Sequence, residues 1–120
     1  MGTFKLKETA TGHVFHLVAG NGETIGTSEV YSSKSACKKG IESVRTNAPI
    51  ANVEDQTADE SAINPKFEIY LDKAGRFRFR LKAKNGENIL ASEGYVAKAG
   101  CKNGIESVRK NAPDAEIVEV

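Results

Sequence analysis

The sequence predicts an α+β protein made of two tandem β-β-β-α-β repeats. Together the repeats are expected to form one pseudo-twofold antiparallel sheet with two helices on one face. Two observations predict this fold. Residues 15–49 and 79–113 align at an offset of 64 with 22 identities in 35 positions, which indicates an internal duplication. Within each copy the hydrophobic period changes from two residues to about 3.6, as it does when strands are followed by a helix.

Length and composition agree with one globular domain. The chain has 120 residues, of which 39% are hydrophobic and 28% charged, and its formal net charge is +1. This balance argues against wholesale disorder and against a strongly basic nucleic-acid arm. No apolar run approaches the roughly 20 residues of a membrane span. The first residues already alternate and lack the apolar centre of a signal peptide, so we expect a cytoplasmic protein.

The strands of each copy follow from alternation and turn residues. The first strand of each copy places apolar side chains at every second position, which is typical of a half-buried strand. A turn around Gly12 in one copy and Ala74-Gly75 in the other leads into a second alternating run. Asn21-Gly22 and Asn85-Gly86 then predict a hairpin turn in which both residues have positive φ. The apolar positions of the first strands are Phe4 and Leu6, and Phe67, Ile69 and Leu71.

A helix follows the third strand in each copy. Ser32 or Ser33 can cap the first helix, whereas Val96-Ala97 predicts a weaker start for the second. Pro49 and Pro113 are expected to end the helices. A fourth short strand is expected over residues 50–53 and 115–120. The positions at helical spacing are Cys37, Ile41, Val44 and Ala48, and Cys101, Ile105, Val108 and Ala112.

Gly40 and Gly104 lie inside the expected helices. Glycine there costs roughly 1 kcal/mol relative to alanine. We expect that each helix lies so close to the sheet that a side chain would collide. Substitution by leucine should then cost well over that amount.

The domain organisation follows from the repeat. Residues 1–53 form the first repeat, residues 54–66 an acidic linker closed by Asn64-Pro65, and residues 67–120 the second repeat. A flexible linker of this length spans about 20 Å, which suffices to join two adjacent halves of one compact domain.

The repeated motif resembles that of the YegP-like family of small bacterial proteins, a domain of unknown function. The resemblance rests on Asn-Gly-Glu-x-Ile-x-x-Ser-Glu-x-Tyr followed by Gly-Ile-x-Ser-Val-x-x-Asn in residues 83–113, with residues 19–49 as its echo. It implies paired β(3)-α-β units that share one sheet and exchange their last strands. The two repeats of one chain would then take the place of the two subunits of a dimer, and the protein would be a monomer. The resemblance implies no activity, cofactor or catalytic residue.

One segment of the second copy has the pattern of a binding surface. In a strand, its basic residues would line the face away from the helices, spaced about 6.6–7 Å apart, and could follow a phosphate backbone or an acidic protein surface. Tyr70, on the outward face of the preceding strand, could offer a stacking ring. We call this set the basic stripe: Arg76, Arg78, Arg80, Lys82 and Lys84, with Tyr70.

Two observations favour a simpler interpretation of the basic stripe. Glu68 and Asp72 on the preceding strand can neutralise it as cross-strand pairs. The first copy does not repeat it, because Val14, His16 and Val18 occupy the aligned outward positions. The two valines raise a further alternative, an exposed apolar patch for protein contact.

Other candidate chemistry is sparse. Cys37 and Cys101 occupy equivalent positions on the apolar side of the helices, which favours buried, inert thiols; a disulfide would require their Cα atoms within about 7 Å. We identify no catalytic, cofactor-binding or metal-binding residue. The leading hypothesis is therefore a non-catalytic binding module for nucleic acid or an acidic partner. A small structural or stress-associated interaction protein is the alternative, and an enzyme is the third choice.

Overall fold

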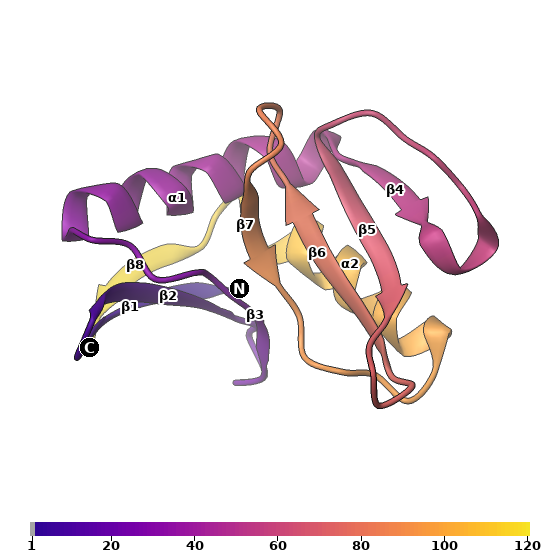
Figure 1. Cartoon of the computed structure of the whole chain (residues 1–120). Helices are drawn as coiled ribbons and strands as arrows, with labels where there is room; N and C mark the ends of the chain where they lie inside the picture. The colour runs from indigo at the N-terminus through magenta and orange to yellow at the C-terminus, as the bar shows by residue number, and fades with distance from the viewer. Residues whose placement is uncertain (1) are drawn as a thin grey trace.

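A computed structural model describes residues 2–120 as eight strands, two α-helices and two short 3-10 helices (Figure 1). The first repeat contains β1 (Thr3–Thr9), β2 (Gly12–Val18), β3 (Thr24–Thr27), α1 (Lys34–Asn47), η1 (Ala48–Ile50) and β4 (Asn52–Asp55). The second contains β5 (Lys66–Leu71), β6 (Phe77–Lys82), β7 (Asn88–Ala91), α2 (Lys98–Asn111) and β8 (Glu116–Glu119). Each repeat is thus β-β-β-α-β, as predicted.

All eight strands belong to one sheet, in the order β4-β5-β6-β7-β3-β2-β1-β8. The first repeat's last strand, β4, pairs with β5 of the second repeat, and β8 of the second pairs with β1 of the first. Figure 1 shows the consequence, since yellow β8 lies beside indigo β1. The exchange of last strands is therefore confirmed. Both of these edge pairs are parallel, so the sheet is mixed rather than antiparallel, because a helix carries the chain back before each last strand.

The two halves of the sheet meet at its centre. β3 pairs with β7 through Thr27 and Ala91 alone. Helix α1 contacts β7 of the second repeat as well as β1 and β2, and α2 contacts β3 as well as β6. Each helix therefore spans the junction between the repeats, and packing rather than strand pairing carries most of the contact there.

The hairpin turns differ from the expected type. Gly22 and Gly86 have φ of 88° and 84°, but neither asparagine has positive φ. The Gly22 amide donates to the Ala19 carbonyl (2.9 Å), and the Ala19 amide donates to the Glu23 carbonyl (2.8 Å). These bonds describe a type I turn followed by a left-handed glycine, the arrangement of a longer hairpin loop with a bulge.

The helices begin and end as their sequences indicate. Ser33 caps α1, its hydroxyl accepting a hydrogen bond of 3.0 Å from the Ala36 amide, whereas no side chain caps α2 at Ala97. Helix α1 passes directly into η1, in which Pro49 lies near the start. Because η1 occupies residues 48–50, the following strand begins at Asn52, two residues later than predicted.

The core lies between the sheet and the two helices. Phe4 and Phe15 meet edge to face with ring centroids 5.7 Å apart, and Phe67 and Phe79 repeat this at 5.8 Å. All four rings are fully buried. Cys37 of α1 and Cys101 of α2 are buried and form no disulfide, as expected.

Gly40 and Gly104 mark a close approach of each helix to the sheet, as predicted. The group in the way is a tyrosine. A methyl group at Gly40 would overlap the Tyr31 hydroxyl and come within 3.2 Å of Phe15. At Gly104 it would come within 2.9 Å of Tyr95 Cζ and 3.0 Å of Phe79. Each glycine thus accommodates a tyrosine ring that lies between helix and sheet, stacked on a phenylalanine.

Residues 54–66 are ordered by polar contacts. Glu54 and Asp55 end β4, Gln56–Ala58 form η2, and Lys66 begins β5. The Glu54 carboxylate accepts hydrogen bonds from Gln56 Nε2 (2.8 Å) and from the Ala62 amide (2.7 Å). This segment therefore folds back over the outward face of the sheet where β4 meets β5.

Candidate binding surfaces

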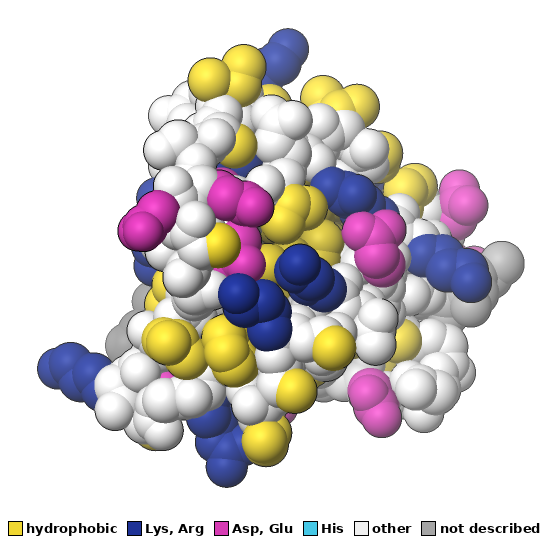
Figure 2. Space-filling view, turned by 90° about the vertical axis from the view of Figure 1, so that its right-hand side faces the viewer, with side chains coloured by type: hydrophobic (Ala, Val, Ile, Leu, Met, Phe, Trp, Pro, Cys, Tyr) yellow, Lys and Arg dark blue, Asp and Glu magenta, His cyan; other side chains and the backbone are white. Residues whose placement is uncertain are grey.

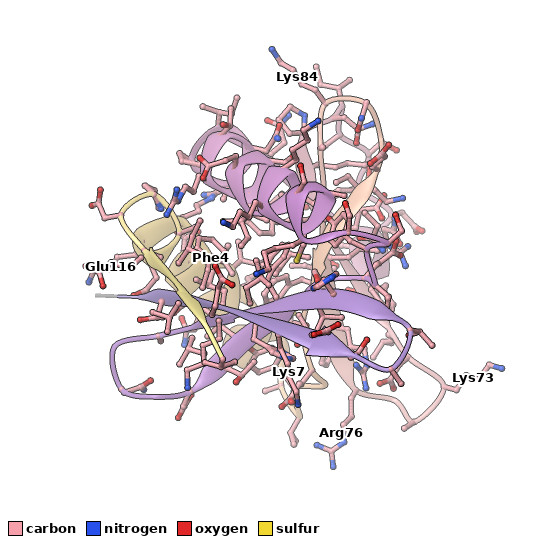
Figure 3. All side chains as sticks on the ribbon, turned by 90° about the vertical axis from the view of Figure 1, so that its left-hand side faces the viewer. Phe4, Lys7, Lys73, Arg76, Lys84 and Glu116 are labelled. Atoms are coloured by element: carbon pink, nitrogen blue, oxygen red, sulfur yellow. The ribbon has the colours of Figure 1, made fainter. Side chains whose placement is uncertain are left out.

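The strand β6 carries the middle of the basic stripe on the outward face of the sheet. Phe79 and Leu81 are buried toward the helices, and the three basic residues that alternate with the apolar ones are partly exposed on the outward face. Arg76 precedes β6 and Lys84 lies in the turn that follows it. Figure 3 shows these two end residues pointing away from each other at opposite ends of the molecule. The outward residues of β6 are Arg78, Arg80 and Lys82.

Arg78 is held in an ion pair. Its Nε donates to Asp72 Oδ2 at 2.6 Å, and its Nη1 donates to the Ser92 carbonyl at 3.2 Å. The hydrogen bond from Arg78 is the main cause that lowers the pKa of Asp72, and backbone amides of Arg76 and Ala74 add to it. The Arg78 charge is therefore balanced within the hairpin that joins β5 and β6.

Arg80 is balanced as well. Its Nε lies 2.5 Å from Glu68 Oε1, and its guanidinium lies 4.4 Å from the centroid of the Tyr70 ring. Burial alone would raise the pKa of Glu68, but hydrogen bonds from Arg80 and Lys66 lower it below its usual value. One face of Tyr70 is thus already occupied by Arg80.

Lys66 links this pair to the edge of the sheet. Its ammonium lies 2.9 Å from Glu54 Oε1 and 3.2 Å from Glu68 Oε2, and both carboxylates are almost fully buried. The hydrogen bonds from Lys66, Gln56 and the Ala62 amide lower the pKa of Glu54 to about 2. The buried charges of Glu54 and Glu68 are therefore compensated, and Glu68 neutralises Arg80 of the stripe.

Unpaired basic groups remain on the outward face of both halves. Within residues 2–120, Lys82 forms no ion pair, and neither do Lys5 and Lys7 on β1. Figure 3 shows Phe4 between β1 and α1, and Lys7 on the opposite side of the sheet. Burial, together with Lys7 and Lys5, lowers the pKa of His16 between them. The predicted basic stripe did not include these two lysines, although their alternation with Phe4 and Leu6 placed them outward.

The apolar contact patch proposed for Val14 and Val18 is not exposed. The two side chains are only 9% and 7% exposed. Val14 pairs with Lys7, and Val18 pairs with Thr3 on one side and Thr24 on the other. Long side chains such as that of Lys7 can bury neighbouring apolar groups under their aliphatic part. That prediction was wrong.

A second surface lies at the β4 end of the molecule. Figure 2 shows hydrophobic side chains gathered near the middle of this face, bordered by basic and acidic ones. A hollow of about 290 Å³ lies here between β4 and α2, lined by Val53, Lys102, Asn103, Ile105 and Glu106. Sequence reasoning gave no sign of it, because it forms only when β4 is exchanged onto the second repeat.

The described chain offers little else for chemistry. Burial raises the pKa of both thiols, that of Cys101 to about 11, so neither is a ready nucleophile. Across residues 2–120 no three side chains of the types that bind metals come together. Among the described residues, neither α1 nor α2 has the length and hydropathy of a membrane-spanning helix.

This chain is similar in sequence and in structure to members of one protein family. The model of a domain of unknown function, DUF1508, matches residues 9–55 and again 72–119. A UPF0339 protein of Bordetella pertussis is 40% identical over 114 residues, covering 95% of this chain and 91% of its own. One from Treponema denticola is 71% identical over 55 residues, which are 46% of this chain and 95% of its own.

Two solution structures share the whole fold. A protein of unknown function from E. coli, yegP, superposes with a TM-score of 0.80 at 36% identity, covering 98% of this chain and 91% of that one. The UPF0339 protein SO3888 from Shewanella oneidensis gives 0.81 at 36% identity, covering 98% and 90%.

Proposed function

The chain belongs to the DUF1508 family, whose function is unknown, and from its own surface we propose that it is a non-catalytic module that binds nucleic acid on the outward face of its sheet. The two matched segments and the two solution structures also confirm the resemblance to the YegP-like family. Neither the family description nor the relatives' names supply a ligand. The proposal therefore rests on this chain's residues.

The observation that carries the proposal is a cationic sheet face made by both repeats. Lys5 and Lys7 come from β1, and Lys82 comes from β6, all without an ion pair among residues 2–120. Both helices pack on the other face, so this one is open except where residues 56–65 fold back over it. A phosphate backbone is attracted to such a surface without needing a pocket.

The arginines of the stripe would contribute to nucleic-acid binding through their planar guanidinium groups more than through free charge, because their charges are already paired. Arg80, stacked on Tyr70 and paired with Glu68, offers a planar guanidinium of fixed position. A base of a single strand can stack on such a plane. Because few free charges contribute, binding should be weak at physiological salt, with a modest salt slope of roughly 0.7–0.9 per neutralised phosphate.

An interaction with protein is the second candidate. Exposed apolar side chains flank the start of β4, since Ile50 is 60% and Ile63 80% exposed and the Ile63 carbonyl accepts from Asn52. The hollow beside Val53 lies on the same strand. Such a patch suits a protein partner better than a nucleic acid. A cytoplasmic, monomeric protein is part of the same proposal, and it is supported by two free cysteines and by an exchange satisfied within one chain.

Fluorescence anisotropy tests the nucleic-acid proposal. Short labelled single- and double-stranded DNA and RNA are titrated with the protein at low and near-physiological salt. We expect saturable binding that weakens with salt and is lost in the Lys7→Glu, Lys82→Glu double variant. The matched control is Lys102→Glu, Lys110→Glu, which makes the same charge change on exposed positions of α2.

Arg78 and Arg80 are unsuitable for this test, since their loss would remove the ion-pair partner of Asp72 and leave Glu68 paired with Lys66 alone. Absence of binding at low salt, or equal loss in both double variants, would rule out the outward face as a nucleic-acid surface. Binding to an acidic protein that is lost only in the Lys7→Glu, Lys82→Glu variant would instead identify a protein partner for the same face.

A further inference from the structure

A polar hollow lies between helix α1 and the turn that joins β6 to β7. Its volume is about 270 Å³, and its walls come from different repeats. Tyr31, Lys39, Gly40 and Ser43 belong to the first repeat, whereas Asn85 and Glu87 belong to the second. The strand exchange and the helix that spans the junction bring them together, so neither repeat alone contains the site.

The lining of this hollow is retained between the two copies. Seven of its nine residues have an identical counterpart 64 positions away. By contrast, none of the three outward positions of β6 matches its counterpart on β2. After duplication, therefore, the helix-side hollow kept most of its lining, with Ala36 and Lys39 as the exceptions, while the outward face changed.

Packing explains only part of this retention. Gly40 makes room for Tyr31, and the Asn85 side chain accepts a hydrogen bond of 3.0 Å from the Glu87 amide. The Glu87 side chain is different, because it is exposed and forms no hydrogen bond or ion pair within residues 2–120. The same glutamate nevertheless stands in the first copy as Glu23.

The polar groups of the hollow carry opposite charges on opposite walls. Glu87 supplies a carboxylate from the β6–β7 turn, and Lys39 supplies an ammonium from α1. The two do not pair with each other, nor does either pair with another group in the described range. Tyr31 lines the same hollow, with its ring against Gly40. Burial, followed by Cys37, Glu29 and Glu87, raises the pKa of Tyr31, so the phenol stays protonated and can donate.

From this arrangement we propose that the hollow binds a small zwitterion, with the ammonium and carboxylate of a free α-amino acid. The ligand's ammonium lies against Glu87, its carboxylate against Lys39, and the Tyr31 hydroxyl donates to the carboxylate. The hollow's volume is just below the range of pockets for drug-sized ligands, which suits a molecule of this size. This site is separate from the cationic sheet face.

The second copy supplies a natural comparison. Tyr95, Gly104 and Glu23 form the equivalent surface, and Glu23 lies close enough to contribute to the raised pKa of Tyr95. Asn103 stands there in place of Lys39. The equivalent surface lacks the cation for the carboxylate, so the chain binds one zwitterion rather than two.

The test is a titration of the full chain with each common amino acid, followed by amide chemical shifts in NMR. At about 10 mM ligand, well above a millimolar Kd, at least one amino acid should shift the amides of Lys39, Gly40 and Glu87. The N-acetylated form and the carboxamide of the same amino acid should lose the effect, because each removes one of the two charges.

Two exposed substitutions make the comparison symmetrical. Lys39→Asn replaces the cation of the first hollow with the residue of the second copy and should weaken binding at least tenfold. Asn103→Lys should create a second site, seen as new shifts at Tyr95 and Gly104. Absence of any shift from all amino acids, shifts that the blocked ligands reproduce, or no effect of Lys39→Asn would each overturn the proposal.

Discussion

The Arg109 guanidinium donates a hydrogen bond of 2.6 Å to the carbonyl oxygen of Ala51, 58 residues earlier in the chain. Arg45 makes the equivalent hydrogen bond to the Ala115 carbonyl. Ala51 and Ala115 immediately precede the exchanged strands β4 and β8. Each helix therefore holds the backbone of the other repeat at the point where its last strand crosses over.

The Arg109→Ala variant should lower the free energy of unfolding by about 1.5–3 kcal/mol, the range for a hydrogen bond from a charged group. The guanidinium also lies 5.5 Å from the centroid of the Phe67 ring, so packing is lost as well. Urea unfolding measures the change, with Lys110→Ala, an exposed neighbour, as the control. Equal stability of the two variants would mean that the bond to Ala51 contributes nothing.

Deletion of residues 116–120 should destabilise both repeats together. Strand β8 pairs with β1 of the first repeat, and α2, which precedes β8, packs on β6 and β3. The loss of β8 therefore affects both halves of one cooperative unit. Amide hydrogen exchange should show protection falling alike in β1–β2 and in β5–β6. Retained protection in β5–β6 alone would show that the halves unfold independently.

Gly40→Ala should destabilise the protein by about 1–3 kcal/mol, although alanine favours a helix more than glycine does. The added methyl group overlaps the Tyr31 hydroxyl. Removing that hydroxyl with Tyr31→Phe should recover part of the loss, and thermal unfolding of the four members of this double-mutant cycle measures the coupling. If the changes in unfolding free energy of the two single variants simply add in the double variant, the methyl group at position 40 does not meet the Tyr31 hydroxyl.

Glu54 should make the free energy of unfolding fall as the pH is lowered below about 4.5. Its pKa is lowered from 4.5 to about 2 in the folded protein, chiefly by the hydrogen bond from Lys66. A group of this kind stabilises the fold above its unfolded pKa, and that contribution is lost as the pH falls through its folded pKa.

The urea midpoint of the Glu54→Gln variant should therefore fall less than that of the parent chain between pH 4.5 and 2. Glu8→Gln, which changes an exposed carboxyl at the end of β1, should leave the parent's pH profile as it is. Parallel profiles for the parent and Glu54→Gln would show that the Lys66 contact does not perturb Glu54.

The sequence predicted the architecture well because duplication displays each element twice. The positions of Gly40 and Gly104 predicted close helix–sheet contact, although only the structure showed that Tyr31 and Tyr95 fill the space. The parallel edge pairs were missed, since strand direction depends on where the helix returns the chain.

Side-chain neighbours across strands were harder to predict. Alternation placed Arg80 outward, and Glu68 was named as its possible partner, but the shared contact of Lys66 with Glu54 and Glu68 depends on how residues 56–65 fold. The hollow beside Tyr31 was missed because its walls lie about 50 residues apart in sequence. The retained pair Glu23 and Glu87 was the one available signal.

The pairing of β8 with β1 repeats that of β4 with β5, both in direction and in neighbours. A connection like residues 56–65 could therefore join the end of β8 to the start of β1 without altering a strand. In such a circular chain the last strand of each repeat would pair with the first strand of the other. Termini between β8 and β1 and termini between β4 and β5 would then leave the same strand pairing in the sheet. The fold is accordingly suited to circular permutation, with new termini placed among residues 56–65.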